Sequence, residues 1–275
     1  MQNKENKYYF PEGGLSTQKD LSSGRAVFKS SYAVIPKDVM QDIVVSYFPR
    51  WHGTRAWVLA RPLSGFSQTF SQSVLEISAG GGSEEPEDDK NVECVLFVVN
   101  GELDITVENT SHRIIPGSYV YVPPGMDWGI KNISEQSAHV HWIRKIYQTV
   151  VGLDAPNFFV KNDKDVEQIK MPLSNGVWST TRFVDPLDMR HDMHVNIVNI
   201  APGGSIPFME THVKEHGIYV LQGKGVYRLN QDWVEVEAGD FLWLRAFCPQ
   251  ACYAGGPEEF RYLLYKDVNR QIKLG

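Results

Sequence analysis

One carboxylate and two imidazoles lie close together in the second half of the chain and could bind a metal ion. The run reads Gly204-x5-Glu210-x-His212-x3-His216-x6-Gly223. Side chains alternate between the two faces of a β-strand, so Glu210 and His212 would point to the same side. His216 follows after a short further stretch and could complete the cluster. A carboxylate with two imidazoles suits a divalent metal, so this spacing predicts a metal site.

Short β-type segments must position these residues, because they dominate the chain and are separated by Gly, Pro, Asn and Asp. Their spacing is typical of a β-sandwich or barrel, and the clearest ones cover residues 92–99, 103–107, 119–122, 194–200, 218–221 and 260–265. Long helical periodicity is absent from the sequence. Residues 37–43 and 163–169 are expected to form short helices or turns.

An internal repeat divides the chain into two similar halves. When the second half is shifted back by 122 residues it lies on the first without a gap, and Glu215 falls on Glu93. Turn glycines also coincide, because Gly203, Gly223 and Gly239 fall on Gly81, Gly101 and Gly117. The repeat predicts two stacked barrels: residues 56–153 and residues 154–275, preceded by an extension of residues 1–55 that packs on them, with a linker at residues 162–167.

The motifs in both halves resemble those of the cupin family. The run around Glu210 has the spacing of the cupin metal motif, with Glu in place of its first His and His in place of its usual Glu. The first half carries the second cupin motif as Gly117-x5-Pro-Pro-Gly-x2-Trp128, with Trp in place of the usual metal-binding His. The resemblance implies an all-β bicupin, built from two tandem cupin barrels of the jelly-roll type.

The repeat also supplies a fourth candidate ligand. Trp128 falls on Gln250 in the second half, and a Gln side chain can offer its carbonyl oxygen. The set Glu210, His212, His216 and Gln250 carries one negative charge and suits Mn(II), with Fe(II), Ni(II) and Zn(II) as alternatives. A divalent ion would leave the site at a charge of about +1, which favours an anionic substrate.

The same four positions in the first half carry Asp88, Lys90, Cys94 and Trp128. An ammonium and an indole cannot bind a metal ion. The N-terminal barrel is therefore expected to be a metal-free structural partner, and a small-ligand pocket inside it is the alternative. Cys94 is expected to be a small buried filler rather than a nucleophile.

Three further side chains could face the metal. Tyr262 and Lys266 are evenly spaced in the last β-type run and therefore share a face, and Tyr227 lies in the run after Gly223. If that face is the barrel interior, Lys266 could bind a carboxylate and the tyrosines could donate hydrogen bonds. If it is the exterior, these side chains are solvated. The residues alone leave both orientations open.

Residues 210–227, Gln250 and residues 262–270 closely resemble the (S)-ureidoglycine aminohydrolase family of bicupin enzymes, and residues 24–36 are also similar to it. The resemblance implies one Mn(II) per chain in the C-terminal barrel, held by the four ligands above. It implies substrate contacts from Tyr227, Tyr262 and Lys266, and catalytic roles for Glu210, Tyr262 and Lys266. It also implies a homo-oligomer.

The implied reaction converts (S)-ureidoglycine and water to (S)-ureidoglycolate and ammonia in the breakdown of allantoin, a part of purine catabolism. Loss of ammonia followed by addition of water, and direct displacement, are both compatible with the sequence. Another metal-dependent bicupin enzyme, an Fe(II) dioxygenase or an isomerase, is one alternative, although a fourth protein ligand leaves less room for O2. A non-catalytic cupin that binds a small ligand is the other, and the intact ligand set argues against it.

Bulk properties narrow the partners and the compartment. The net charge of -6 and the lack of a basic stripe argue against nucleic acid. The longest apolar run, residues 94–99, is far shorter than a membrane span, and residues 1–7 lack the apolar core of a signal peptide. Three cysteines without metal-type spacing suit a reducing compartment. We therefore expect a cytoplasmic enzyme that acts on a small anionic molecule.

Overall fold

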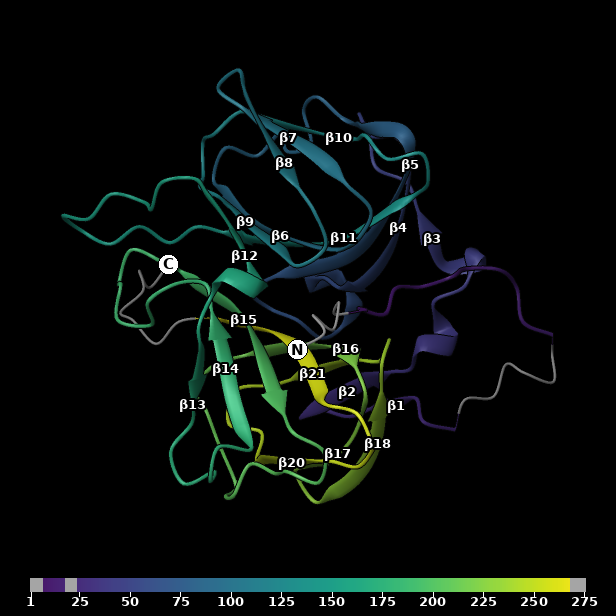
Figure 1. Ribbon diagram of the computed structural model, residues 1–275, viewed down its shortest axis with the longest axis vertical. Coiled ribbons are helices and arrows are strands. Elements are labelled where there is room, and N and C mark those ends of the chain that lie inside the picture. Colours follow the sequence, from purple (N-terminus) through teal and green to yellow (C-terminus); the bar gives the residue numbers. More distant parts are fainter. Residues whose placement is uncertain (1–6, 18–23, 268–275) are drawn as a thin grey trace.

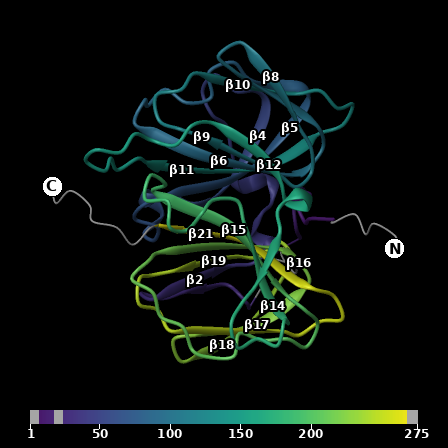
Figure 2. The same cartoon turned by 60° about the vertical axis from the view of Figure 1, so that its left-hand side comes forward.

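The computed structural model describes residues 7–17 and 24–267, which form two β-barrels stacked on one another (Figures 1 and 2). The described residues contain no α-helix, and their helical turns are short 3-10 segments. Three of these turns, Lys37–Val39, Asp42–Val44 and Asp163–Asp165, lie where short helices or turns are expected. The predicted all-β bicupin fold is confirmed. Residues 1–6 and 18–23 of the extension and residues 268–270 of the family-like C-terminal run lie outside the described residues.

The N-terminal barrel is built mainly from the first half of the chain. Its strands are β3 (Val45–Ser46), β4 (His52–Ala60), β5 (Ser71–Ser83), β6 (Val92–Asn100), β7 (Leu103–Val107), β8 (Thr110–Ile114), β9 (Ser118–Val122), β10 (Trp128–Asn132), β11 (Ala138–Ile146) and β12 (Phe159–Asn162). They form one sheet in the order β12-β9-β6-β11-β5-β10-β7-β8, with β4 pairing with β3 and β5. Strands such as β6 are rich in Val, Leu and Phe, which pack well on a pleated surface.

The C-terminal barrel combines an eight-stranded and a three-stranded sheet. Its strands are β1 (Val27–Phe28), β2 (Tyr32–Ile35), β13 (Gln168–Lys170), β14 (Trp178–Arg182), β15 (Met193–Ile200), β16 (His216–Gln222), β17 (Lys224–Leu229), β18 (Asp232–Glu237), β19 (Phe241–Leu244), β20 (Gln250–Ala254) and β21 (Phe260–Asp267). The larger sheet has the order β1-β2-β19-β16-β21-β15-β14-β13, and the smaller one β18-β17-β20.

The strands follow the sequence repeat. A shift of 122 residues places β20 on β10, and it places the starts of β15 and β21 on the starts of β5 and β11. Both halves therefore use the same order of strands along the chain. The second cupin motif of the first half coincides with the segment that contains Gln250 in the second half, as the repeat predicts.

The large sheets of the two barrels pack face to face and share one apolar core, while each barrel has a second core inside. Strand β21 contributes to two of these cores. Leu263 and Tyr265 point into the core between the barrels, and Tyr262 and Leu264 point into the C-terminal barrel. Lys266 continues this alternation, so the structure places Tyr262 and Lys266 on the interior face.

Glu215, a buried carboxylate of the C-terminal barrel, helps to hold the two barrels together. Glu215 accepts hydrogen bonds from the backbone N–H groups of residues 68 and 69, at 2.7 and 2.9 Å, and from the indole N–H of Trp243 at 2.6 Å. Its repeat counterpart Glu93 accepts one from the hydroxyl of Tyr121 at 2.8 Å, and Tyr121 is the counterpart of Trp243. Buried charges need such partners, which explains why this residue type recurs in both halves.

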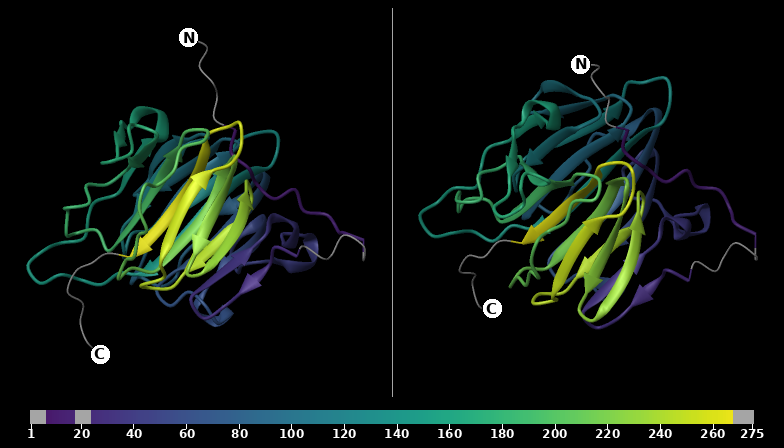
Figure 3. Two further views of the ribbon diagram at one scale, coloured as in Figure 1. Left: turned by 90° about the horizontal axis from the view of Figure 1, so that it is seen from below. Right: turned by 60° about the horizontal axis from the view of Figure 1, so that its bottom comes forward.

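Two pieces of chain pair with a barrel outside the residue range predicted for it. Strands β1 and β2 precede the N-terminal barrel, yet β2 pairs with β19 at the edge of the C-terminal sheet (Figure 3). Strand β12 follows residue 153, yet it pairs with β9 of the N-terminal barrel. The division into residues 1–55, 56–153 and 154–275 stays a proposal, with these strands exchanged across its boundaries.

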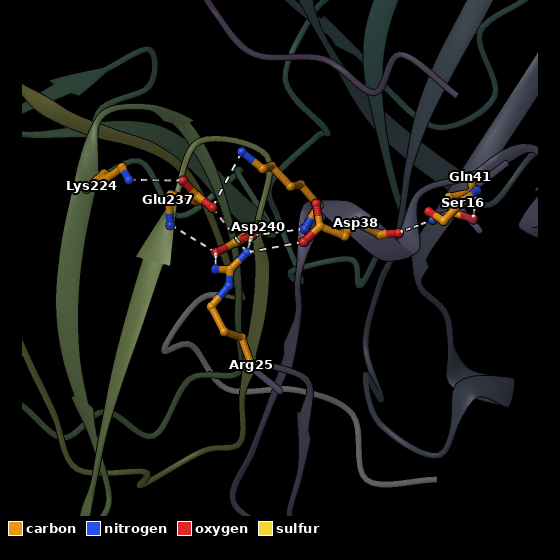
Figure 4. A network of polar contacts seen from close by, with 8 residues as sticks. Ser16, Arg25, Asp38, Gln41, Lys224, Glu237 and Asp240 are labelled. Carbon is orange, nitrogen blue, oxygen red and sulfur yellow. Dashed lines mark hydrogen bonds and ion pairs between the residues drawn. The ribbon is translucent and has the colours of Figure 1, made fainter. Parts of the chain in front are cut away.

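A polar network fixes the N-terminal segment to the C-terminal barrel (Figure 4). The carboxylate of Asp240, whose side chain is fully buried, accepts hydrogen bonds from Arg25 and from the backbone N–H groups of Lys37 and Glu237, the last two at 2.9 Å. Burial raises the pKa of Asp240, and the bonds from Arg25 and the backbone oppose that rise. Glu237 adds ion pairs to Lys37 and Lys224, each at 3.4 Å.

Acidification is expected to destabilise the fold through buried histidines. Burial lowers the pKa of His141 to about 3 from an unfolded value of 6.5. Between these values the unfolded chain binds more protons, so stability falls as the pH drops below 6.5. From there to pH 5 the loss from this residue is about 2 kcal/mol, measurable by urea unfolding.

His141→Gln should reduce this pH dependence of the unfolding free energy. A smaller part should remain, because burial also lowers the pKa values of His139 and His194. An equal loss of stability in wild type and variant between pH 7 and pH 5 would argue against a buried neutral His141.

Candidate metal centre and substrate cavity

A cavity of about 180 Å³ lies inside the C-terminal barrel and brings most of the predicted site residues together. Its lining contains all four predicted metal ligands and two of the three predicted substrate residues, namely Glu210, His212, His216, Gln250, Tyr262 and Lys266. Arg182, Lys214 and apolar side chains that include Trp178 and Ile206 complete the wall. Larger open grooves on the N-terminal barrel, along residues 80–85 and 125–131, contain no comparable set of imidazoles.

Backbone pairing holds the ligands in place. The N–H of Glu210 donates to the carbonyl of Gln250 at 2.8 Å, and the N–H of Gln250 donates back at 2.9 Å. Strand β20 thereby fixes the loop that carries Glu210 and His212. His216 begins β16, where it pairs with Leu244 of β19 and with Lys266 of β21. Three ligands and the lysine are thus tied to neighbouring strands.

Pairs of these candidate ligands lie close together. The carboxylate of Glu210 lies 3.9 Å from Nε2 of His212, and the rings of His212 and His216 are 5.1 Å apart between centroids. The side-chain nitrogen of Gln250 lies 3.2 Å from Nδ1 of His216. Within residues 7–17 and 24–267, no three His, Cys, Asp or Glu side chains already form a group that could hold a metal ion.

The chemistry of these donors nevertheless fits a divalent cation. Burial lowers the pKa of His216 to about 3, with repulsion from His212 and two lysines as lesser causes. Burial also lowers the pKa of His212. Both imidazoles are therefore neutral near pH 7, and metal binding needs that state. Burial raises the pKa of Glu210, and a nearby cation would favour its ionised form.

The predicted substrate residues differ in their access to the cavity. Burial, followed by repulsion from Lys214 and Arg182, lowers the pKa of Lys266 to about 8. Tyr262 lines the cavity, whereas Tyr227 is fully buried and does not line it. The ring of Tyr227 lies behind that of Tyr262, 6.0 Å away between centroids. Tyr227 is thus placed to support Tyr262 rather than to meet a ligand directly.

Two further cavity residues, Lys214 and Arg182, lie outside the predicted ligand and substrate sets. Lys214 lies between two predicted ligands, and its position inside the Glu-x-His-x3-His run is a signal that could have identified it. Arg182 ends strand β14 in the run Trp-Ser-Thr-Thr-Arg, where it lies two residues after Thr180. Thr180 and Arg182 are two residues apart and therefore share a face of the strand. This spacing is the one sequence feature that points to a role for Arg182.

The residues at the four corresponding positions of the N-terminal barrel form ion pairs or lie in the apolar core. Asp88 and Lys90 are exposed and form ion pairs, with Arg50 and Asp127. Cys94 and Trp128 are buried in the apolar core of that barrel. Burial raises the pKa of the Cys94 thiol to about 12, which disfavours the thiolate that binds metals. These residues could not hold a metal together without rearrangement.

Cys94→Ala is expected to affect stability but not turnover. The side chain is 2% exposed within the core of the N-terminal barrel, and truncating it should lower the free energy of unfolding by about 1–2 kcal/mol. Chemical unfolding and steady-state kinetics on the same preparation check this. A large fall in kcat with unchanged stability would assign this barrel a direct role in the reaction.

Sequence comparison with named proteins assigns the chain to a family. The sequence pattern of the cupin domain matches residues 196–265, and that of a Mif2/CENP-C-like domain matches residues 63–144. A protein of Escherichia coli named (S)-ureidoglycine aminohydrolase is 30% identical over 94% of this chain and 96% of its own length. The chain belongs to the (S)-ureidoglycine aminohydrolase family. It is therefore a hydrolase that acts on a C–N bond. The family member of Arabidopsis thaliana is 29% identical over 90% of this chain and 78% of its own length.

Solved structures share this fold over most of the chain. A protein from Pseudomonas aeruginosa described as glyoxylate-induced is 59% identical, with a TM-score of 0.91 over 98% of this chain and 99% of its own. The E. coli protein Ylba is 28% identical, with a TM-score of 0.80 over 94% of this chain and 100% of its own. Salicylate 1,2-dioxygenase from Pseudoaminobacter salicylatoxidans is 16% identical, with a TM-score of 0.65 over 88% of this chain and 82% of its own, and shares the fold alone.

No helix within the described ranges is long and apolar enough to span a membrane.

Proposed function

We propose that the chain hydrolyses (S)-ureidoglycine to (S)-ureidoglycolate and ammonia, with one Mn(II) in the C-terminal barrel. Membership of the family supports the hydrolysis of a C–N bond. The metal and the substrate are supported by one observation: the oxygen and nitrogen donors Glu210, His212, His216 and Gln250 share a cavity with the ammonium of Lys266.

Four side chains would hold the metal. The carboxylate of Glu210 and the amide oxygen of Gln250 are hard donors, and the neutral imidazoles of His212 and His216 are borderline ones, a set that suits Mn(II). When bound, the ion would supply a fixed positive charge that orients and polarises the amine or ureido group of the substrate. His216 and Gln250 begin strands β16 and β20, which fix their backbones.

The remaining residues would bind and orient the substrate. Lys266 would hold its carboxylate, and the hydroxyl of Tyr262 would donate a hydrogen bond. Both side chains are largely buried, so these contacts are stronger than they would be in water. With several fixed anchors, only one face of the reacting carbon would be open to water, which would account for a single stereochemical outcome. Elimination followed by addition and direct displacement use the same anchors.

The cellular setting is part of the same proposal. The family resemblance supports a place in allantoin and purine catabolism, a cytoplasmic location and a homo-oligomer. The partner would be a small anionic molecule rather than nucleic acid or a membrane. A dioxygenase function is the competing proposal for a cupin with this fold, and Gln250 as a fourth protein ligand argues against it, because it would leave less room for O2.

Ammonia release from freshly made (S)-ureidoglycine tests the proposed function. The chain is stripped of metal and assayed alone and with Mn(II), Fe(II), Ni(II) or Zn(II), against the rate without protein. We expect release only with metal, and the highest rate with Mn(II). Oxygen consumption is followed in parallel with aromatic substrates. Release at the protein-free rate with every metal would rule out this function.

A further inference from the structure

Three cations line the cavity without a carboxylate partner. Among the described residues, Arg182, Lys214 and Lys266 form no ion pair, although ion pairs are frequent elsewhere in the chain. Glu210 is the acidic residue of the cavity wall. With these groups ionised, the wall carries a net charge of about +2 before any metal binds, and a partly buried charge without a partner is unfavourable. The cavity therefore needs negative charge from a ligand.

Arg182 is held in an orientation that suits such a ligand. It pairs with Asn196 of β15, which in turn pairs with Leu264 of β21, and all three side chains line the cavity. Its Nε donates to the hydroxyl of Thr180 at 3.1 Å, and its Nη2 lies 3.5 Å from the sulfur of Met171. Nη1 makes no hydrogen bond to a described residue. The guanidinium is thus held in place, and its Nη1 is free to donate to a ligand.

The first half of the chain provides an internal comparison. Arg144 of β11 is the repeat counterpart of Lys266, and its Nε donates to Glu87 at 2.6 Å. The repeat counterpart of Glu87 is Met209, which is 41% exposed. The N-terminal barrel thus neutralises the cation at this strand position with its own carboxylate. The C-terminal barrel has an apolar residue in place of that carboxylate and leaves the cation to a ligand.

We infer that Arg182 is a second anion-binding residue of the cavity, and that the cavity takes small ligands with two anionic or oxygen-rich ends, of which short dicarboxylates are the simplest class. The inference rests on the proposed function for the position of the substrate. Lys266 binds one end as a point charge, and Arg182 binds the other through its free Nη1. In ureidoglycine those ends are the carboxylate and the ureido carbonyl.

Calorimetric titration with malonate tests this role on the full chain loaded with Mn(II). Wild type should bind malonate more tightly than the monoanion propionate. Arg182→Gln should weaken malonate binding by roughly 10- to 100-fold, the effect of losing a charge-assisted contact. Any bond between malonate and the metal is common to both proteins and cancels in their ratio. Arg182→Lys should recover part of the affinity, because it restores the charge but not the position of the Nη1 donor.

The matched control is Arg190→Gln, because Arg190 is exposed and paired with Asp188; malonate affinity should not change. Arg182→Met keeps the apolar stem and replaces the Gln variant if that one does not fold, as judged by circular dichroism and melting temperature. Wild-type malonate affinity in a folded Gln or Met variant would overturn the inference. Absence of ureidoglycine turnover beside malonate binding that depends on Arg182 would overturn the proposed function alone.

Discussion

Replacing His216 with Ala is expected to remove both the bound metal and the ammonia-releasing activity, with a loss of at least about 1000-fold in kcat/KM. The imidazole is 4% exposed and neutral, and it lies at the start of β16, where two neighbouring strands fix its backbone. Its loss would leave three donors, and a four-ligand site depends on the whole set. Elemental analysis and the ammonia assay on one preparation measure both effects, and His212→Ala should behave alike.

The control for this pair is His52→Ala, which truncates an exposed histidine of the N-terminal barrel. It should keep one metal ion per chain and wild-type turnover. Unchanged metal content in both His212→Ala and His216→Ala would refute the assignment of these ligands. Two metal ions per wild-type chain would contradict the expectation that the N-terminal barrel is metal-free.

Lys266→Met is expected to reduce kcat/KM by about 30- to 1000-fold, or roughly 2–4 kcal/mol, without changing the metal content. The variant keeps most of the apolar stem and removes the charge that would pair with the substrate carboxylate. Tyr262→Phe should act in the same direction more weakly, because a neutral hydrogen bond contributes less. Steady-state kinetics on (S)-ureidoglycine, beside metal content, measure both effects.

Lys224→Met is the matched control for Lys266→Met, because Lys224 belongs to the same barrel and its side chain is 68% exposed. It should leave kcat/KM unchanged. If Lys266→Met also gives wild-type kinetics, the carboxylate anchor is another residue, and Arg182 is then the first to examine.

Much of the fold could be predicted because the sequence contains two copies of one pattern. The repeat aligns Gln250 with Trp128, so it predicts a candidate ligand that has no motif of its own. The alternation along β21 limited Tyr262 and Lys266 to a common face, but a strand with apolar residues on both faces does not reveal which face is interior. Packing against the other barrel decides that question, since Leu263 and Tyr265 fill the shared core.

Other features depend on tertiary contacts that local sequence does not encode. Arg182 enters the cavity because of the register between β14 and β15, and no motif reports that register. The depth of Tyr227 behind Tyr262 depends on ring packing, whereas alternation alone would only place it inside the barrel. Strands β2 and β12 pair with the sheet edges that are available in the folded chain. Each has four residues, which is too short for its sequence to specify which edge it joins.

That exchange of edge strands means that the chain has no point at which it can be divided into two self-sufficient halves. A fragment ending at residue 153 would lack β12, and one beginning at residue 154 would lack β2, which pairs with β19. Each fragment would present a row of unpaired backbone N–H and C=O groups, the kind of surface that promotes aggregation. The two barrels depend on each other, so we expect the chain to unfold in a single cooperative transition.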